Sequence, residues 1–375
     1  MGHQFADVSG IRKNYATTGP RYDGCLGERN SSQTRSRSFL VLINLVSIGC
    51  LIWSLHDAKL GQLKHDLYTM NWWWVALAVV ADIGVYCWHA WRWSLLLHPV
   101  EPVTFGQTVR AIYVGLFANE VLPFRAGEVL RCFLLSRWTD LPFSVSLTSA
   151  LIERIFDGIW LCLCLLVTVK IVLFPQHLRY LIDGGYALGI IVIVGALLLA
   201  LAMFHHHRTG ALLNRPWQRH LRVLIDDLNL IGHSRYLYFA FLQSLPYLLL
   251  QVIPIYASFK GYGFDDLTLG AAFATMVILR LGSVVPQAPG NLGLFQLLTK
   301  ETLERIFNYA PADAARFSLV LWGIVTLPLL IGGVIALSVT GARIGELRKA
   351  AHVGKLELAS QRANLGAEPV APDGD

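Results

Sequence analysis

The sequence predicts an all-α integral membrane protein, because it is unusually apolar and because its apolar residues gather in long runs. Of its 375 residues, 54% are hydrophobic and only 15% are charged, whereas a soluble domain carries about 25% charged residues. A spanning helix needs about 20 mostly apolar residues. Six segments meet that requirement: about 38–56, 71–97, 143–174, 181–204, 236–259 and 314–340.

The two ends of the chain differ from this apolar middle. The first 37 residues are polar and contain no apolar run of the kind that a cleaved signal peptide has. We therefore expect 1–37 to be a disordered cytoplasmic tail. Residues 38–340 form the expected transmembrane domain, and 341–375 form a second cytoplasmic tail. The Trp72-Trp73-Trp74 run at the start of the second span suits an aromatic belt at the membrane surface.

Two further apolar regions are interrupted by helix-breaking residues. The region 103–137 is split at 119–128, and the region 266–308 is split at 286–293. Proline and glycine at this density should end one helix before another begins. Non-helical backbone at membrane depth is tolerated only where it is buried in protein or lines a water-filled cavity. Both regions are therefore predicted to be broken, re-entrant helical pairs.

The basic residues indicate an orientation. Twenty Lys and Arg residues fall in the two tails, in 98–142 and in 204–235, and six fall in the segments that would face the other side. The positive-inside rule then places both termini in the cytoplasm. The number of crossings must be even, and six full spans satisfy this if the first broken region enters from the cytoplasm and the second from outside.

Under this topology the two halves of the chain have the same order of elements in opposite orientation. Each half reads span, span, broken pair, span, which predicts an inverted-topology repeat over 38–174 and 181–340. Such repeats, with broken helices near the midplane, are typical of transporters that alternate access. The alternative is that both broken regions cross twice, which gives ten spans. Cysteines placed at Asn119 and Asn291 would be labelled from opposite sides only in the repeat.

Ionisable residues cluster around the first break. Glu120, Arg125, Glu128 and Arg131 lie on either side of it. Free backbone N–H groups at helix ends favour anions, and arginine binds phosphate through paired hydrogen bonds. Arg125 and Arg131 are therefore candidates for holding a lipid phosphate. The alternative is that these side chains only anchor a loop at the level of the cytoplasmic headgroups.

A second group of charges lies inside an apolar run. Glu153 and Asp157 are four residues apart and share a helix face, with Arg154 beside them. Ionisable residues within a span are costly and mark functional sites. The expected partners are arginines of the other regions: Arg125, Arg131 or Arg280. A structural ion-pair network that locks helices together is the alternative, and both roles can coexist.

Nothing in the sequence indicates a metal or a cofactor. The six cysteines form no CxxC pair, and the chain contains no HExxH, no GxSxG and no phosphate-binding glycine loop with a lysine. The formal net charge is +6. Because the basic residues lie between apolar runs, they indicate anionic membrane lipids as partners rather than nucleic acid.

Three motifs in this order resemble one known family. They are N-x-x-L-P-x-R-A-G-E-x-x-R at 119–131, E-R-x-x-D at 153–157 and P-G-N-L-G-x-F at 289–295. Together they are similar to the transmembrane region of lysylphosphatidylglycerol synthases, the flippase-like family, over roughly 38–340. The tail after the last span is too short for the aminoacyl-transferase domain of the fused members. The resemblance therefore implies a stand-alone member.

The resemblance implies a translocator, not an enzyme, that moves a phospholipid or lipid-linked amphiphile between the leaflets of a bacterial inner membrane. The chain departs from the family pattern at two positions, where Asn291 replaces a usual glycine and Gln296 replaces a usual glutamate. The residues expected to bind or pass the lipid are Asn119, Glu120, Pro123, Arg125, Gly127, Glu128, Arg131, Glu153, Arg154, Asp157, Arg280, Pro289, Gly290, Asn291, Gly293 and Gln296.

Two alternatives remain beside this interpretation. One is a membrane-embedded glycosyltransferase or other lipid-modifying enzyme, which would need acidic residues in one exposed loop. Asp265 and Asp266 are the one such pair expected to face outward, and they are interpreted as a cap for the following helix. The other alternative is an accessory partner of a lipid-synthesis enzyme. The sequence does not identify the lipid, the direction of transport or its energy source.

Overall fold

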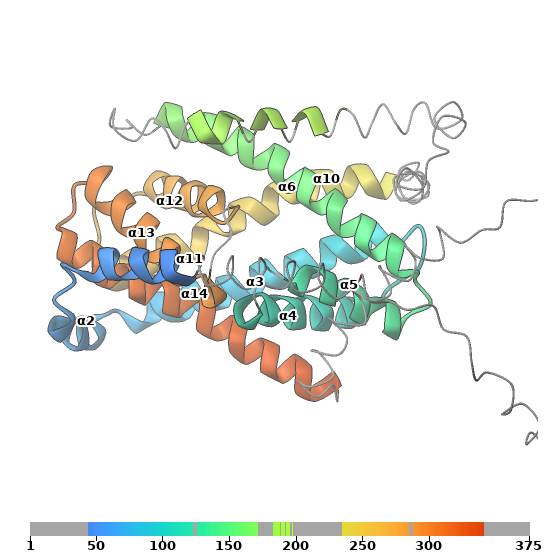
Figure 1. Cartoon of the computed structure of the whole chain (residues 1–375), viewed down its shortest axis with the longest axis horizontal. Helices are drawn as coiled ribbons and strands as arrows, with labels where there is room; N and C mark the ends of the chain where they lie inside the picture. Colours follow the sequence, from blue (N-terminus) through green and yellow to red (C-terminus); the bar gives the residue numbers. More distant parts are fainter. Residues whose placement is uncertain are drawn as a thin grey trace, which may run out of the picture. The chain divides into compact units, whose positions relative to one another are not determined.

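The computed structural model describes residues 44–122, 126–171, 183–187, 189–191, 193–195, 197, 235–284 and 288–340. Every regular element within these ranges is a helix (Figure 1). The two predicted tails lie outside the described residues, and so do Pro123 and Arg125 of the first break.

The helices follow the order that the apolar pattern predicts, with short helices added in the loops. Their bounds are η1 (Leu60–Gln62), α2 (Leu63–Thr69), α3 (Trp72–Leu97), α4 (Phe105–Val121), α5 (Gly127–Trp138), α6 (Phe143–Ile171), α10 (Arg235–Leu250), α11 (Val252–Tyr262), α12 (Leu269–Gly282), η4 (Pro289–Asn291), α13 (Leu294–Arg305) and α14 (Pro311–Thr340).

Three helices in the described ranges are long and apolar enough to cross a membrane. They are α3, the combined α10 and α11, and α14, and they confirm the helices predicted at 71–97, 236–259 and 314–340. The break between α10 and α11 falls at Gln251. Pro254 explains it, because proline offers no N–H to the carbonyl four residues earlier, at Leu250.

The other predicted spans are helical where the structure describes them. α6 has 29 residues, long enough to span, but it carries Glu153, Arg154 and Asp157 in its middle. Helix also covers Asn44–Leu55 and parts of Asp183–Gly195. The number of crossings remains a prediction.

Side chains cap several of these helices. Asn71 precedes α3 and accepts a hydrogen bond from the Trp73 backbone N–H at 3.1 Å. The Gln107 side chain accepts from the Thr104 N–H at 3.0 Å at the start of α4. Thr268 caps α12 by accepting from the Ala271 N–H at 3.4 Å. Each bond satisfies a donor that has no partner within its helix.

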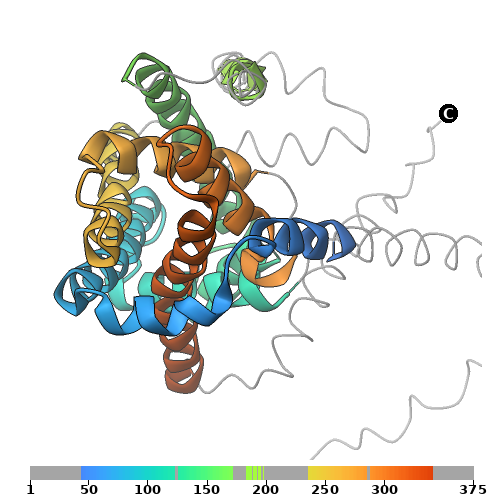
Figure 2. The same cartoon turned by 90° about the vertical axis from the view of Figure 1, so that its left-hand side faces the viewer.

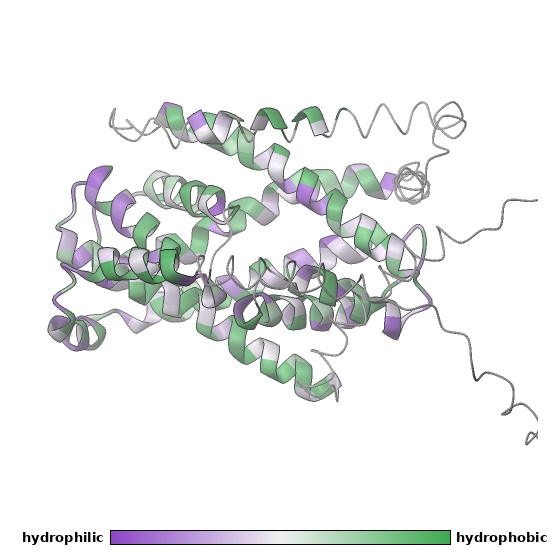
Figure 3. Ribbon diagram, viewed as in Figure 1, coloured by the Kyte–Doolittle hydropathy of each residue, from purple (hydrophilic) through white to green (hydrophobic). Residues whose placement is uncertain are grey.

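The described helices are apolar outside and charged inside, which is the arrangement of a membrane protein. Arg92, Arg131 and Glu153 are buried, whereas large apolar side chains along α6 and α14 are exposed. Figure 3 shows the hydrophobic colour along these two helices. A soluble protein rarely exposes so much apolar surface, whereas a lipid-facing helix does so by necessity. The exposed examples include Leu163, Leu166, Val167, Leu327, Ile331, Val334 and Ile335.

Both interrupted regions form pairs of packed helices, as predicted. In the first, α4 and α5 lie against each other, and Gly115 meets Gly127 where they touch. A Cβ atom at Gly127 would lie 1.8 Å from the Gly115 carbonyl oxygen. The backbones can approach this closely only because neither residue has a side chain.

The described part of the second break contains three residues with positive φ: Gly290 (79°), Asn291 (53°) and Gly293 (98°). Gly293 ends this turn directly before α13. A Cβ there would lie 2.1 Å from the carbonyl oxygen of Ser47 on the first helix. Both its φ and its surroundings therefore require glycine.

Helices in the two halves of the chain have matching partners. α3 packs on α4 and α11 on α12; α5 packs on α6 and α13 on α14; α4 packs on α14 and α12 on α6. α3 packs along both α10 and α11, beside which it lies in Figure 2. Each of the contacts named here thus has a counterpart in the other half. The inverted-topology repeat remains a prediction.

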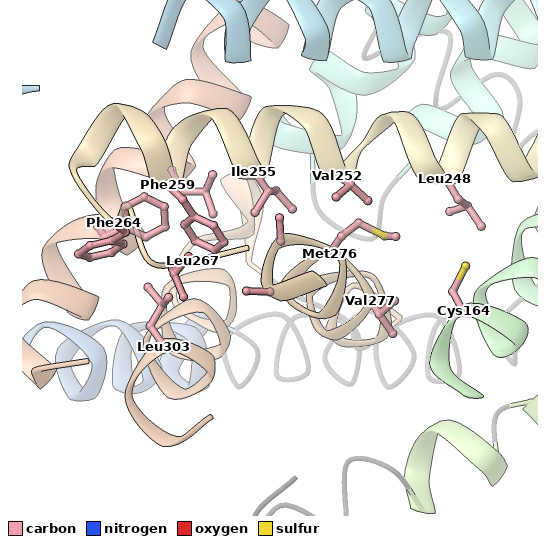
Figure 4. Packing of buried hydrophobic residues seen from close by; sticks show 14 of the residues in the cluster. Cys164, Leu248, Val252, Ile255, Phe259, Phe264, Leu267, Met276, Val277 and Leu303 are labelled. Atoms are coloured by element: carbon pink, nitrogen blue, oxygen red, sulfur yellow. The ribbon is translucent and has the colours of Figure 1, made fainter. Parts of the chain in front are cut away.

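The largest apolar cluster fills the space between α10, α11, α12 and α13. Leu248, Val252, Ile255 and Phe259 follow one side of α10 and α11 toward α12, as Figure 4 shows. Within lipid, helices gain little from the hydrophobic effect, so such contacts stabilise the fold through dispersion and close packing. The cluster holds the second broken pair against the centre of the protein.

Candidate functional site

The two broken helix pairs meet at a cavity of about 220 Å³. Helices α3, α4, α10, α12 and α14 and the turn η4 contribute to its wall. Its apolar lining comes mainly from α12, α13 and α14. Its polar lining consists of Asp82, Tyr86, His89, Asn119, Glu120, Glu128, Arg154, Tyr247, Gln251, Arg280, Ser283, Asn291, Trp322 and Thr326.

One face of α3 supplies a polar stripe to this site. Asp82, Tyr86, His89 and Arg92 are spaced by four, three and three residues, so they share a face of the helix. The first three line the cavity. Arg92 lies deeper, with 1% of its surface exposed, and it begins a network of ion pairs.

Arg92 links α3 to α6. Its Nη1 atom donates to Asp157 Oδ1, and its Nη2 atom lies 3.3 Å from Glu153 Oε1. Nη1 also donates to the Ser244 hydroxyl on α10 at 2.7 Å. The guanidinium carbon lies 4.6 Å from the centre of the Tyr247 ring. The charge of this buried arginine is therefore compensated on several sides.

Arg131 links α5 to the same glutamate. Its Nη2 donates to Glu153 Oε2 at 2.9 Å, and its Nε lies 3.0 Å from Glu128 Oε2. His89 Nε2 lies 3.4 Å from Arg131 Nη1 and 3.5 Å from Glu153 Oε1. Glu153 thus sits between two arginines and a histidine at the junction of three helices.

We call this group the buried ion network: Arg92, Glu128, Arg131, Glu153, Arg154 and Asp157. Arg154, which is half-exposed, completes it through an ion pair with Glu128. Three arginines thereby balance three carboxylates. Buried charges are tolerated when they are paired and hydrogen-bonded in this way. The network joins α3, α5 and α6 in a fixed arrangement.

Arg280 on α12 has different partners from those expected. Its Nε donates to the side-chain oxygen of Gln251, and its Nη2 donates to the Tyr247 hydroxyl at 3.2 Å. Both partners are neutral. In the part of the chain that the structure describes, no carboxylate forms an ion pair with Arg280. The expected pairing of Arg280 with Glu153 or Asp157 is wrong, because Arg92 and Arg131 occupy those carboxylates.

Two asparagines hold the breaks in place. Asn119 Oδ1 accepts a hydrogen bond from the Gly127 N–H at 2.9 Å, which satisfies a free donor at the start of α5. Asn291 Nδ2 donates to Glu120 Oε1 at 2.8 Å, which connects η4 to α4. Asn291 also has a φ of 53°, in the region where asparagine replaces glycine most readily. Its departure from the family pattern thus adds a bridge between the two breaks.

The other predicted site residues at or just after the second break shape the backbone. Gln296 Oε1 accepts from the Gly293 N–H at 2.7 Å, a role that a glutamate could also fill. The Gly290 carbonyl accepts from the Trp322 indole of α14 at 2.8 Å. Pro289 is the first residue of η4. Pro289, Gly290, Gly293 and Gln296 lie close in sequence to Asn291, which lines the cavity. None of these four residues lines it.

Six of the predicted site residues line the cavity, and they come from both breaks and α6. They are Asn119, Glu120, Glu128, Arg154, Arg280 and Asn291. Arg131, Glu153 and Asp157 belong to the buried ion network beneath it. Gly127 allows the close contact between α4 and α5.

Five important side chains were not among the predicted site residues: Asp82, His89, Arg92, Tyr247 and Gln251. Arg92 lies near the end of α3, where an arginine often extends to the membrane surface, but only 1% of its surface is exposed. The helical spacing of the α3 residues was the signal that could have identified that stripe.

The acidic pair Asp265 and Asp266 also has a structural role, although not the expected one. Asp266 accepts a hydrogen bond from the Tyr309 hydroxyl, and the Asp265 carbonyl accepts from Lys260 Nζ at 2.6 Å. Thr268, not either aspartate, caps α12. The expectation of an aspartate cap is therefore wrong.

These features define a multi-pass helical membrane protein with a polar cavity between two interrupted helix pairs. Residues 40–333 match the family model described as the lysylphosphatidylglycerol synthase TM region. The chain belongs to this family, which confirms the resemblance seen in its three motifs.

Two relatives come from the archaeon Methanothermobacter thermautotrophicus, and both are described as UPF0104 membrane proteins. The first is 23% identical over 281 residues, which cover 69% of this chain and 80% of the relative. The second is 24% identical over 122 residues, which cover 32% of this chain and 35% of that protein. The descriptions of both relatives establish a membrane protein and no activity.

Proposed function

We propose that this protein is a lipid translocase, which moves a phospholipid or a lipid-linked amphiphile between membrane leaflets. The observation that carries the proposal is the polar cavity between the two breaks, with Arg280 in its wall. Arg280 has neutral partners, so its charge is available to an anion. The phosphate of a lipid headgroup is the anion that a membrane presents in abundance, and arginine binds it well.

In this proposal the headgroup enters the cavity while the acyl chains remain in lipid. The polar lining replaces water around the headgroup and so lowers the barrier to crossing the apolar interior, where a bare charge is costly. The exposed apolar faces of the surrounding helices would contact the acyl chains. The buried ion network would keep α3, α5 and α6 together while the cavity changes its access.

The proposal extends to the topology. Both termini would lie in the cytoplasm of a bacterial inner membrane, and 38–174 and 181–340 would form the inverted repeat. The two broken pairs could then open the cavity to one leaflet at a time. The bridge between Asn291 and Glu120 would have to change in each cycle, because it joins the two breaks. A lipid-synthesis enzyme would be a partner that supplies the lipid.

Reconstituted liposomes test the proposal directly. The full chain is incorporated into vesicles that contain fluorescent phosphatidylglycerol or phosphatidylethanolamine, and a membrane-impermeant quencher reports the lipid that reaches the outer leaflet. We expect the wild type to accelerate exchange. Arg280→Gln should reduce the rate by roughly tenfold or more, since hydrogen bonds to a charged group contribute about 1.5–3 kcal/mol each.

Arg137→Gln is the matched control, because Arg137 is an exposed arginine of α5 away from the cavity lining. Arg280→Lys keeps the positive charge, so comparing it with Arg280→Gln separates the effect of losing the charge from the effect of misfolding. Size-exclusion chromatography also detects misfolding. No acceleration by the wild type for any lipid, including an extract of bacterial membrane lipids, would contradict the proposal. So would an Arg280→Gln variant as fast as the wild type.

A further inference from the structure

Asp82 is a buried carboxylate, and one of its oxygens receives no hydrogen bond from the described part of the chain. It lies in the middle of α3 and 6% of its surface is exposed. Its Oδ2 atom has no hydrogen-bond partner among the residues that the structure describes. Asp82 also lines the cavity. A buried polar atom without a partner is costly, so it points to a group that the cavity receives from outside.

Arg280 lies in the wall of the same cavity. Asp82 and Arg280 line the same cavity, yet no ion pair within 4.0 Å joins them in the described part of the chain. The cavity thus presents a cation and an acid separately. A ligand that carries both a negative and a positive group could contact each of them.

The other charges around the cavity are already occupied. Glu128 pairs with Arg131 and Arg154, and Glu120 accepts from Asn291. His89 lies beside Arg131 and Glu153 in the buried ion network. In the described part of the chain, Asp82 and Arg280 are therefore charged side chains of the cavity wall that a ligand can engage without displacing an ion pair or the bridge between Asn291 and Glu120.

We propose that Asp82 and Arg280 form a subsite for a zwitterionic headgroup, in which Arg280 binds the phosphodiester and Asp82 accepts hydrogen bonds from a primary ammonium group. This inference rests on the proposed function and specifies its substrate class. The cavity of about 220 Å³ is several times larger than the minimum of about 10–15 Å³ that a single water needs. It therefore has room for a small headgroup such as a phosphodiester joined to a short amino alcohol.

Water-soluble headgroups test this subsite without requiring transport. The full chain in detergent is titrated with sn-glycero-3-phosphoethanolamine and sn-glycero-3-phosphoglycerol, and calorimetry gives both dissociation constants. The two ligands share the phosphodiester, but only the first has an ammonium group. We expect the wild type to bind the first more tightly by roughly ten- to a hundredfold, as a charge-assisted hydrogen bond predicts.

Two substitutions divide the recognition between its parts. Asp82→Asn keeps the side-chain size and should abolish the preference for the amine, while binding of the glycerol ligand stays unchanged. Arg280→Gln should weaken the binding of both ligands. Asp140→Asn is the control, since Asp140 is exposed in the turn between α5 and α6. sn-Glycero-3-phosphocholine has a cation without N–H donors. The wild type should therefore show little preference for it over the glycerol ligand.

The outcomes separate this subsite from the proposed function. Equal binding of the two ligands by the wild type, binding of neither, or an intact preference in Asp82→Asn would each overturn the subsite. Amine-selective binding in a protein that moves no lipid in vesicles would support the subsite and overturn the translocase. Equal translocation of phosphatidylglycerol and phosphatidylethanolamine, unchanged by Asp82→Asn, would support the translocase and overturn the subsite.

Discussion

The charged side chains of this protein fall into two groups that differ in how they are compensated. In the buried ion network, each arginine faces at least one carboxylate. In the cavity above it, Asp82 has an unpartnered oxygen and Arg280 has neutral partners. Both groups are costly to place at membrane depth. The difference indicates that the first group serves the fold and the second serves a ligand.

Position on the helices explains this division. Glu153 and Asp157 lie four residues apart on α6, where they face Arg92 of α3 together. Asp82 lies ten residues before Arg92 on α3, which is nearly three helical turns away. Asp82 instead lines a cavity together with Arg280 and Gln251, and no base of the described residues lies within ion-pair distance of it.

The largest effect should come from the network. Glu153→Gln leaves Arg92 and Arg131 buried with one fewer carboxylate, so we expect a loss of about 3–5 kcal/mol in the free energy of unfolding. This loss is measured by thermal unfolding in detergent, in which size-exclusion chromatography monitors the folded protein. Asp140→Asn should leave the unfolding temperature unchanged. If Glu153→Gln unfolds at the wild-type temperature, the network is not a structural lock.

Asp82→Asn should behave in the opposite way. It removes a charge that has no ion-pair partner among the residues that the structure describes, so we expect the free energy of unfolding to rise or to stay within about 1 kcal/mol of the wild type, as at many functional sites. The same unfolding measurement applies. A loss as large as that of Glu153→Gln would show that Asp82 belongs to the structural group after all.

Asn291→Gly tests the bridge between the two breaks. Glycine accepts the φ of 53°, so only the hydrogen bond to Glu120 is lost, at a cost of about 0.5–1.5 kcal/mol. We expect a small decrease in unfolding temperature and a faster exchange of lipid in vesicles, because the breaks would separate more easily. An unchanged rate would mean that the bridge does not limit the cycle.

The smallest effect should come from Asp57, outside the spanning helices. Lys300 Nζ donates to it at 3.1 Å and lowers its pKa below the usual value. The ionised form is favoured in the folded state, so the stabilisation is present above the unfolded pKa and disappears as the pH falls through the folded pKa. Asp57→Asn should therefore be slightly less stable than the wild type at pH 7 and equally stable in strong acid.

The sequence predicted the helices and the breaks well because both depend on local chemistry. Apolar runs predicted α3 and α14, and proline with glycine predicted the ends of α4 and α12. The pairings depend on contacts between distant residues, and here prediction was weaker. Arg92 lies near a tryptophan-rich helix end, which favoured a membrane anchor, although α6 supplies the acids that neutralise it. Asp82 gained its importance only when Arg280, nearly two hundred residues later, proved to line the same cavity.

The hydrogen bond between Trp322 and the Gly290 carbonyl gives the protein an optical reporter. The indole lines the cavity and joins α14 to the second break, so its environment should change whenever that break moves or a headgroup enters. The chain contains 11 tryptophans, and fluorine-labelled tryptophan would separate their signals by NMR. The resonance that disappears in Trp322→Phe belongs to Trp322. It would then report movements of the turn η4 while the protein acts in a membrane.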